Sequence, residues 1–355
     1  MLASTASSAG PSPGRVLIVD DSAVARAVLG RVVAGSPALT VTGTAATAAA
    51  ALAFLAEHRV DLVILDIQMP GVDGLTALPK LIAASRGAKI LIVSAAAGDG
   101  AAATIQALAL GAADTLVKPA PGERARRFEA DLIEKLERLL APVASSSARP
   151  GSTAPAALGT TVAFDIVAIG ASTGGIHALS HLLRALPPSF TAPILVTQHL
   201  PSSFIPYFAT QLAVLGGRPC DVAVDRLRIR PGRIIVAPGD AHLRCVDLGE
   251  GGAAVRLSAE PAPSGCLPSV DPMFESLADC FGPRALGVVL SGMGRDGTEG
   301  ARRLAAAGAC VVAQDEASSA VWGMPGSVVA AGLANAVIEP QAIGRLIAAR
   351  KRPIC

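Results

Sequence analysis

The sequence has few aromatic residues, little net charge and no recognisable cysteine pattern. Hydrophobic residues make up 51% of the 355 residues, a share that alanine inflates, whereas aromatic residues make up only 3%. We therefore expect helices and sheets that pack through small side chains. The formal net charge is +2, without a long basic run or a basic stripe with interleaved aromatics, which argues against a nucleic-acid-binding protein.

Disulfides, metal-thiolate sites and membrane spans are not predicted either. The six cysteines form no C-x-x-C motif and no metal-ligand spacing with histidine, so free and mostly buried thiols are expected. Residues 1–14 lack a basic start and an apolar stretch, which predicts a disordered tail over 1–13 and no signal peptide. The alanine-rich stretch 44–56 is too short and too weakly apolar to span a bilayer. We expect a cytoplasmic protein without direct membrane insertion.

The most informative stretch is a strand, a glycine-rich turn and a helix around Ser172. Residues 166–169 are a short apolar run that predicts a buried strand, and residues 176–186 have the apolar spacing of a helix. Between them lies Gly170-Ala-Ser-Thr-Gly-Gly175. Because glycines remove the crowding of Cβ atoms in a sharp turn, the Ser172 hydroxyl can lie at the sheet end beside the first N–H groups of a helix. This G-x-S-x-G pattern is typical of a nucleophile elbow.

A phosphate or dinucleotide loop uses the same strand, turn and helix. Two features disfavour it here. Ser172 replaces the middle glycine of G-x-G-x-x-G, and the next strand, 194–197, is followed by Gln198-His199 where a ribose-binding Asp or Glu is expected. We favour the nucleophile, although short motifs of this kind also match by chance.

The first half of the chain alternates short apolar runs with stretches of helical periodicity. This alternation predicts a doubly wound parallel sheet of five strands, with ligands at the carboxyl ends of the strands. The predicted strands are 16–19, 39–41, 62–65, 90–93 and 115–117, and the predicted helices are 22–33, 47–58, 74–84, 100–109 and 124–140.

Polar residues lie where these strands end. Asp20 and Asp21 follow the first strand, Asp66 the third, Ser94 the fourth and Lys118 the fifth. Three carboxylates in one crevice repel one another unless a cation lies between them, and oxygen ligands suit Mg²⁺. A lysine and a hydroxyl beside them can hold phosphoryl oxygens, so the set predicts phosphorylation of a carboxylate. Either of the first two aspartates alone could cap the following helix, but capping fits the whole set poorly.

Three stretches of this half contain the aspartates and the lysine of this set: Leu17-Ile-Val-Asp-Asp-Ser22, Leu65-Asp-Ile-Gln-Met-Pro-Gly-Val-Asp-Gly74 and Val117-Lys-Pro119. Through these stretches the half resembles a response-regulator receiver domain, which implies a flavodoxin-like fold. Thr115 stands where the family usually has Tyr or Phe, which puts aromatic rotamer switching in doubt.

The resemblance to receivers also implies roles for the residues at the strand ends. It makes Asp66 the phosphoacceptor, and Ser94 and Lys118 the phosphate contacts and switch residues. The implied Mg²⁺ ligands are Asp20, Asp21, Asp66 and the carbonyl of Gln68.

A linker is predicted over residues 141–161. This stretch is rich in Ala, Pro, Ser and Gly, with almost no charge or large apolar side chain. Because it cannot bury enough surface to fold by itself, we expect it to separate a first domain at 14–140 from a second at 162–355.

Three polar residues follow apolar runs in the second half. They are Ser172, then His199 after the run 194–197, and Asp296 in a glycine-rich turn after 286–290. In a doubly wound α/β domain these strand ends share one edge, where an imidazole can take the serine proton and a carboxylate can orient the imidazole. His199 could instead be a core histidine and Asp296 an ordinary turn residue. His242, expected in a loop, is the competing base.

Six motifs of the second half belong to one family pattern. They are Ile169-Gly-Ala-Ser-Thr-Gly-Gly175, Gln198-His-Leu-Pro201, Ala237-Pro-Gly-Asp240, Ser291-Gly-Met-Gly-Arg-Asp-Gly297, Ala313-Gln-Asp-Glu-Ala317 and Trp322-Gly-Met-Pro325. Through them this half resembles the catalytic domain of the CheB chemotaxis methylesterases. The resemblance implies Ser172 as nucleophile, His199 as general base and acid, and Asp296 as the orienting carboxylate. The backbone N–H of Met293 or of the turn at His199 is the expected oxyanion donor.

Together the two resemblances imply a phosphorylation-activated protein-glutamate methylesterase. Its expected substrates are methyl-accepting chemotaxis receptors, whose glutamate γ-methyl esters it hydrolyses with release of methanol, and it also deamidates receptor glutamines. The expected phosphodonor is the histidine kinase CheA, with Mg²⁺ in the receiver and no cofactor for the esterase. The alternative is a phosphorylation-controlled module that binds a nucleotide or a protein without catalysis.

Overall fold

The structure, a computed structural model, describes residues 12–69, 73–94, 99–119, 125–141, 164–249 and 251–349. Nearly all of the predicted tail and linker lie outside these ranges, so the domain boundaries stay predictions. The chain divides into two compact units, the first made of residues 1–95 and 115–141 and the second of residues 96–114 and 142–355.

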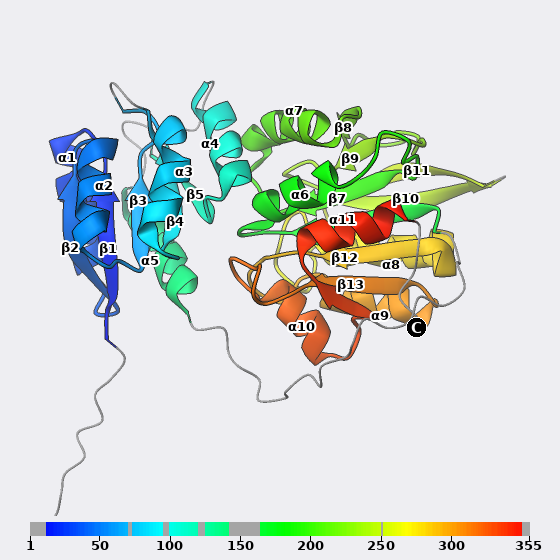
Figure 1. Ribbon diagram of the computed structural model, residues 1–355. Coiled ribbons are helices and arrows are strands. Elements are labelled where there is room, and N and C mark those ends of the chain that lie inside the picture. Colours follow the sequence, from blue (N-terminus) through cyan, green and yellow to red (C-terminus); the bar gives the residue numbers. More distant parts are fainter. Residues whose placement is uncertain are drawn as a thin grey trace, which may run out of the picture. The chain divides into compact units, whose positions relative to one another are not determined.

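The first unit is built on a sheet in the order β2-β1-β3-β4-β5, in which β1 pairs in parallel with β2 and β3, and β3 with β4 (Figure 1). The prediction of five strands is confirmed, although the second runs four residues further than expected. The strands are β1 (Gly14–Val19), β2 (Leu39–Ala45), β3 (Leu62–Leu65), β4 (Lys89–Ser94) and β5 (Asp114–Val117).

The five helices predicted between these strands are also confirmed, each to within one residue at either end. A short polar side chain begins each of the first three: Ser22, Thr47 and Asp73 accept a hydrogen bond from the N–H three residues on. The helices are α1 (Ala23–Ala34), α2 (Ala48–Glu57), α3 (Gly74–Ser85), α4 (Asp99–Leu110) and α5 (Ala125–Leu140).

The second unit contains a seven-stranded parallel sheet in the order β14-β13-β12-β6-β7-β9-β8. The chain runs outward from β6 through β7 and later returns to place β12 on the other side of β6. The winding therefore reverses between β6 and β12, where doubly wound sheets place their sites. The strands are β6 (Ile166–Ala171), β7 (Ile194–Gln198), β8 (Cys220–Val222), β9 (Ile234–Val236), β12 (Ala285–Val289), β13 (Cys310–Gln314) and β14 (Ala336–Ile338).

Helices cover both faces of this sheet (Figure 1). One group contains α6 (Gly175–Arg184), α7 (Ile205–Gly216) and α11 (Pro340–Ala348), and the other contains α8 (Val270–Phe281) and α9 (Thr298–Ala306), with α10 (Met324–Ala330) next to α9. Because both faces are covered, β6, β7, β12 and β13 are buried along their whole length. In the described chain, no helix is both long and apolar enough to cross a membrane.

A two-stranded antiparallel hairpin packs against α8 and lies outside the main sheet. It consists of β10 (His242–Gly249) and β11 (Gly252–Ser258). The prediction that His242 lies in a loop is wrong, because this residue begins β10 and is buried. The Pro-Gly-Asp turn before His242 predicts a loop, but a strand begins directly after it. Buried residues of this strand, such as Leu243 and Cys245, face α8.

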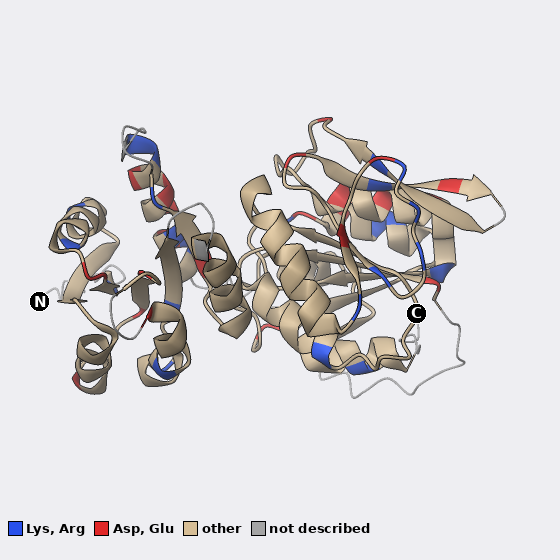
Figure 2. Cartoon of the chain, turned by 90° about the horizontal axis from the view of Figure 1, so that it is seen from above, with Lys and Arg blue, Asp and Glu red and all other residues tan. Residues whose placement is uncertain are grey.

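Residues of both charges are interspersed along the described chain (Figure 2). Many of them pair across neighbouring elements, as Arg15 does with Asp61 at 3.0 Å and Arg233 with Asp221 at 2.6 Å. This distribution agrees with the small net charge of the sequence.

Candidate active site

Ser172 lies in the turn between β6 and α6. Its N–H donates to the carbonyl of Ser291 at 3.0 Å, and its own carbonyl accepts from Gly175 N at 2.8 Å and from Gln198 Nε2 at 2.9 Å. These bonds fix the backbone on both sides of the hydroxyl. The left-handed conformation in this turn belongs to Gly174, with φ 75°, and Ser172 itself has no positive φ. The turn thus differs from a strained nucleophile elbow, because a glycine and not the serine takes the unusual conformation.

The turn after β12 approaches Ser172 closely. A Cβ atom at Gly292 would lie 2.9 Å from the Ser172 Cβ and would also overlap the Met324 sulfur. Gly292 N–H donates to the carbonyl of Val321 at 3.0 Å, which holds this approach in place. Glycine is therefore required here to leave room for the serine.

His199 leaves the sheet beside Ser172. Ala171 and Gln198 are register partners on β6 and β7, and His199 N–H donates to the carbonyl of Ala171 at 3.2 Å. The two residues that follow these partners are therefore the predicted nucleophile and the predicted base. Because the His199 N–H is engaged in this bond, it is not available as an oxyanion donor.

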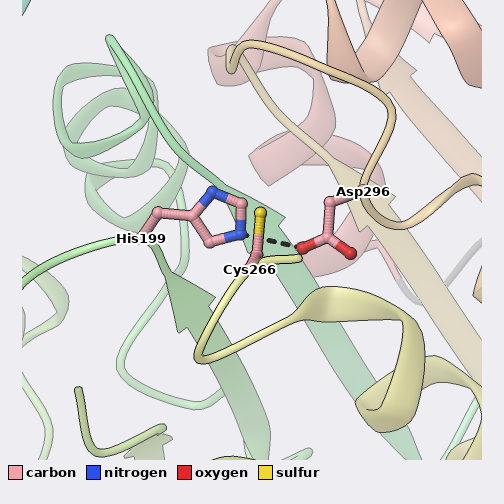
Figure 3. Close-up of side chains that lie close together, drawn as sticks. All are labelled: His199, Cys266 and Asp296. Carbon is pink, nitrogen blue, oxygen red and sulfur yellow. Dashed lines mark hydrogen bonds and ion pairs between the residues drawn. The ribbon is translucent and has the colours of Figure 1, made fainter. Parts of the chain in front are cut away.

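Nε2 of His199 lies 2.8 Å from Oδ2 of Asp296 (Figure 3). A carboxylate can only accept, so Nε2 carries the hydrogen of this bond. The nitrogen left to receive a proton is Nδ1. In the common serine-protease triad the carboxylate binds Nδ1 instead, so the bond to Asp296 uses the other ring nitrogen here.

Asp296 is buried between β12 and α9, at the N-terminus of α8. Its Oδ1 accepts from the Ser269 hydroxyl at 2.6 Å, and its Oδ2 accepts from Val270 N–H at 2.8 Å. Burial disfavours the charged form, but the hydrogen bond and charge of His199 and the bonds from Ser269 and Val270 outweigh it, lowering the pKa of Asp296 to about 2. The positive end of the helix dipole acts in the same direction. Asp296 is therefore ionised at neutral pH.

Opposing effects also act on His199. Burial lowers the pKa of its ring, but the hydrogen bond with Asp296, the neighbouring Cys266 thiol and the Asp296 charge outweigh burial and raise that pKa to about 9. The ring is thus held in the protonated form near neutral pH. Catalysis by a neutral imidazole would require this proton to be lost.

His242, the competing base in the sequence analysis, has a structural position. Its Nδ1 accepts from Ser269 N–H at 2.8 Å, and its Nε2 donates to the carbonyl of Glu260 at 2.8 Å. Both ring nitrogens are occupied and the side chain is buried. His242 therefore orients Ser269 and is not positioned to serve as the base.

Two backbone donors near Ser172 fit an oxyanion site. Met293 is half-buried in the turn after β12, and its N–H makes no hydrogen bond to another described residue. The N–H of Thr173 is likewise unengaged within the described chain, and the residue after the nucleophile supplies a donor in G-x-S-x-G hydrolases. Met293 stays a prediction, and Thr173 is a candidate that the sequence analysis missed.

The predicted phosphorylation residues meet at one end of the first sheet. Lys118 Nζ lies 3.0 Å from Oδ2 of Asp20 and 2.6 Å from Oδ2 of Asp66, and both aspartates are buried. Asp21 is exposed, yet one oxygen of each of the three carboxylates lies within 4.8 Å of the others. Ser94 is buried at the end of β4, and its carbonyl accepts from Lys118 N–H at 2.9 Å.

The electrostatics of this cluster fit a divalent cation. Burial lowers the pKa of Lys118, but its hydrogen bonds to Asp66 and Asp20 outweigh burial and raise the pKa, so the lysine stays charged. One ammonium group faces three carboxylates, which leaves excess negative charge among oxygen ligands of the kind that Mg²⁺ prefers. Gln68 N–H donates to Oδ1 of Asp66 at 3.1 Å, which places Gln68 beside the cluster.

Comparison with protein families decides the identity of both units. The family model described as CheB methylesterase matches residues 167–347, slightly more than half of the chain, and the model described as response regulator receiver domain matches residues 16–127. The chain belongs to the CheB methylesterase family. The receiver match implies that the chain is phosphorylated and has a kinase as partner.

Individual members of the CheB methylesterase family match over nearly their full length. A protein of Caulobacter vibrioides named protein-glutamate methylesterase/protein-glutamine glutaminase 2 is 41% identical over 346 residues, covering 96% of this chain and 99% of that one. A Maricaulis maris protein of the same name without the number is 39% identical, covering 96% of both chains. The crystal structure of the Thermotoga maritima CheB methylesterase catalytic domain covers 53% of this chain and 99% of that one, at 34% identity and TM-score 0.51. These enzyme names favour the esterase over the non-catalytic binding module.

Several residues around the CheB-type site were not found in the sequence analysis. Ser269 precedes α8, where a serine ordinarily caps the helix, but its hydroxyl forms no cap bond because it donates to Asp296. Burial raises the pKa of Asp271, and the charge of Asp296 adds to this effect. The hydrogen bond from Gly300 N–H opposes both, and the resulting pKa is about 7. Cys266 lies beside His199 and Asp296. No local motif marks these residues, since each is defined by a contact with a distant part of the chain.

The described cysteines are all free thiols, as expected, but only two of the five are buried. Cys245 and Cys310 are buried, whereas Cys220, Cys266 and Cys280 are half-buried. The prediction of mostly buried thiols is therefore wrong for the described residues. Cys355 lies outside them.

Proposed function

We propose that this chain is a phosphorylation-activated methylesterase that hydrolyses glutamate γ-methyl esters on methyl-accepting chemotaxis receptors. Ser172 is the nucleophile, His199 the general base and acid, and Asp296 the orienting carboxylate. Family membership, the curated relatives and the bond between His199 and Asp296, which follow the two strands on either side of β6, support this assignment. The receptors and the kinase CheA lie in or face the cytoplasm, which is the location we propose.

In the acylation step, Nδ1 of the neutral His199 ring takes the proton of the Ser172 hydroxyl as its oxygen attacks the ester carbonyl. The resulting imidazolium keeps its Nε2–H bond to Asp296, whose negative charge stabilises it. The N–H groups of Met293 and Thr173 stabilise the negative oxygen of the tetrahedral intermediate, and one such donor is typically worth about 3 kcal/mol. His199 then protonates the departing methoxide, which leaves as methanol.

In the deacylation step, a water molecule loses its proton to Nδ1 of His199 and attacks the acyl-serine. The glutamate carboxylate and the Ser172 hydroxyl are released. A receptor glutamine can enter the same sequence with ammonia as the leaving group, since only the departing group differs. We therefore propose a glutamine deamidase activity at the same site.

In the receiver unit, Asp66 accepts the phosphoryl group from CheA. Asp20, Asp21, Asp66 and the Gln68 carbonyl would hold Mg²⁺, which supplies positive charge to the transferring phosphoryl group. Lys118 and Ser94 contact the phosphoryl oxygens, and Lys118 must exchange its bonds with Asp20 and Asp66 for bonds with the phosphoryl group. Phosphorylation then raises the activity of the esterase unit.

The observation that carries the catalytic proposal is the 2.8 Å bond between His199 Nε2 and Asp296 Oδ2 beside the Ser172 turn. The test measures methanol release from methylated receptor membranes by the full-length wild type and by Ser172→Ala. We expect the substitution to reduce kcat by roughly 10⁶-fold, as for other serine triads. Methanol release by Ser172→Ala at the wild-type rate contradicts the assignment.

The regulatory proposal has a separate test. Methanol release is measured with and without a small-molecule phosphodonor, and the ratio of the two rates is compared between wild type and Asp66→Asn. We expect a ratio above one for the wild type and a ratio of one for the variant. Asp73→Asn is the matched control, because Asp73 only caps α3 through Thr76 N–H and should leave the ratio unchanged.

A further inference from the structure

The esterase site contains a thiol that its mechanism does not use. One ring nitrogen of His199, Sγ of Cys266 and a carboxylate oxygen of Asp296 all lie within 4.8 Å of one another (Figure 3). Cys266 is half-buried, in the segment between β11 and α8. Its sulfur makes a long contact of 3.9 Å with the carbonyl of Ser264 and also interacts with the His199 ring. The sulfur therefore already lies beside the ring that would share a metal ion with it.

These three atoms are ligand types found in zinc sites that have three protein ligands. Imidazole nitrogen, thiolate sulfur and carboxylate oxygen bind Zn²⁺ at about 2.0 to 2.3 Å, with a fourth position left for water. Tetrahedral ligands at these bond lengths are about 3.3 to 3.8 Å apart. The observed arrangement thus reaches zinc geometry through side-chain movements of about an ångström.

The carboxylate is already held by surrounding groups in the way that metal ligands usually are. The Ser269 hydroxyl and Val270 N–H fix the orientation of Asp296 at 2.6 and 2.8 Å. Hydrogen bonds of this kind orient ligands around metal ions and increase affinity. Asp296 also reaches His199, so two of the three ligands are positioned before a metal arrives.

We propose that Zn²⁺ binds His199 Nε2, Cys266 Sγ and a carboxylate oxygen of Asp296, and that it reversibly inhibits the esterase. The ion takes the place of the proton between His199 and Asp296, and the Cys266 thiol releases its own proton to become a thiolate. A neutral imidazole has one free lone pair. When Nε2 gives that pair to zinc, Nδ1 carries the hydrogen and cannot accept the Ser172 proton.

The thiolate gives this site a different metal preference from that of the receiver cluster. Mg²⁺ favours oxygen ligands and binds thiolate and imidazole poorly, whereas Zn²⁺ favours both. Excess Mg²⁺ therefore occupies the aspartates of the receiver without entering the esterase site. The inhibition rests on the proposed role of His199 as base, but the binding of zinc does not.

The binding test is zinc X-ray absorption on the full-length protein with one equivalent of Zn²⁺ and excess Mg²⁺. We expect one sulfur at about 2.3 Å and nitrogen or oxygen at about 2.0 Å. Cys266→Ser should lose the sulfur signal, and Cys280→Ser should keep it. Cys280 is the matched control because it is also half-buried and lies near Cys245, so it is the alternative source of a zinc–sulfur signal. A sulfur signal lost only in Cys280→Ser, or absent from the wild type, overturns the proposal.

The inhibition test compares methanol release with and without Zn²⁺ for each variant. At a Zn²⁺ concentration ten times the dissociation constant, wild type and Cys280→Ser should lose activity about tenfold and recover it with EDTA. Cys266→Ser should be much less sensitive at the same concentration. If zinc binds through Cys266 and the enzyme keeps full activity, the proposed inhibition is wrong. That result would also argue against His199 as the base. Absence of binding overturns the zinc site alone and leaves the esterase assignment intact.

Discussion

The Ser269 hydroxyl donates to Oδ1 of Asp296 at 2.6 Å, so the residue that begins α8 orients the carboxylate that orients His199. The same serine uses its N–H to donate to His242, which is itself held by the carbonyl of Glu260. A chain of hydrogen bonds therefore extends from the β10–β11 hairpin to the His199 imidazole. The hairpin lies outside the main sheet but helps to position the site.

Ser269→Ala tests this chain of bonds. Hydrogen bonds to charged groups contribute about 1.5 to 3 kcal/mol, so we expect kcat to fall by roughly 10- to 100-fold. KM should stay unchanged because Ser269 is fully buried. Ser276→Ala is the matched control, since Ser276 is buried in the same helix and bonds only to the backbone at Met273 and Cys245. If Ser269→Ala lowers the free energy of unfolding but has the same kcat as Ser276→Ala, Ser269 has a structural role only.

Asp296→Asn tests the tautomer of the base. The new amide group would donate to His199 Nε2 and drive the ring proton to Nδ1, the nitrogen that must accept the Ser172 proton. We expect kcat to fall by about 10⁴-fold, as in a serine-protease triad with the same change. Methanol release and thermal unfolding should be measured together, with Asp240→Asn as control because Asp240 is exposed in the loop after β9. Retained activity in Asp296→Asn is incompatible with the proposed triad.

The activity of the free enzyme should rise with pH. Burial lowers the pKa of His199, but Asp296 and Cys266 raise it overall to about 9, and only the neutral ring can take the serine proton. We expect kcat/KM to increase through neutral pH and to level off above about pH 9. Methanol release at constant ionic strength gives this profile. A plateau that already begins near pH 7 contradicts a protonated resting state.

The free energy of unfolding of the second unit should fall as pH rises, whereas the activity should increase. Because the folded pKa of His199, about 9, lies above the ordinary value of 6.5, its contribution is fully present below pH 6.5 and is lost as pH rises through 9. The pKa difference corresponds to about 3 kcal/mol of unfolding free energy. Urea unfolding at several pH values measures it, with His199→Gln as the control that lacks this dependence. If the unfolding free energy of wild type and of His199→Gln changes equally with pH, His199 does not contribute this pH dependence.

Lys118→Met tests the charge balance of the receiver cluster. Removing the ammonium leaves the buried carboxylates of Asp20 and Asp66 facing each other without a counter-ion. We expect the unfolding free energy in EDTA to fall by about 3 kcal/mol, and Mg²⁺ to restore part of it. Lys89→Met is the control, since the only cause that shifts the pKa of Lys89 is its burial. A loss that Mg²⁺ does not reduce would argue against the cation site.

The fold of the first unit could be predicted from the sequence because its pattern is local. The run Leu62–Leu65 is apolar throughout and Ser22, Thr47 and Asp73 begin helices, so neighbouring residues alone define the elements. The positions of Ser172, His199 and Asp296 after strands were predicted for the same reason. Their roles rest on the family resemblance and stay proposals.

The surroundings of the triad could not be predicted, because they depend on contacts between distant segments. Ser269 is 27 residues from Asp296, and nothing near it in sequence distinguishes a helix cap from a carboxylate partner. The bond of Asp296 to Nε2 rather than Nδ1 of His199 joins residues 97 positions apart, which periodicity does not describe. His242 was misplaced because its strand pairs only with β11, outside the main sheet.

The strand order also has a consequence during biosynthesis. β12 lies between β6 and β13 in the sheet, but the ribosome makes it after β7, β8 and β9. Domains begin to fold from the N-terminal side while synthesis continues, so one edge of β6 lacks its neighbour until residues 285–289 emerge. Unpaired strand edges recruit other chains. Products of premature termination before β12 therefore carry an open edge in the middle of the future sheet, so we expect them to aggregate. They also lack Asp296, the proposed orienting carboxylate, so we expect them to be inactive.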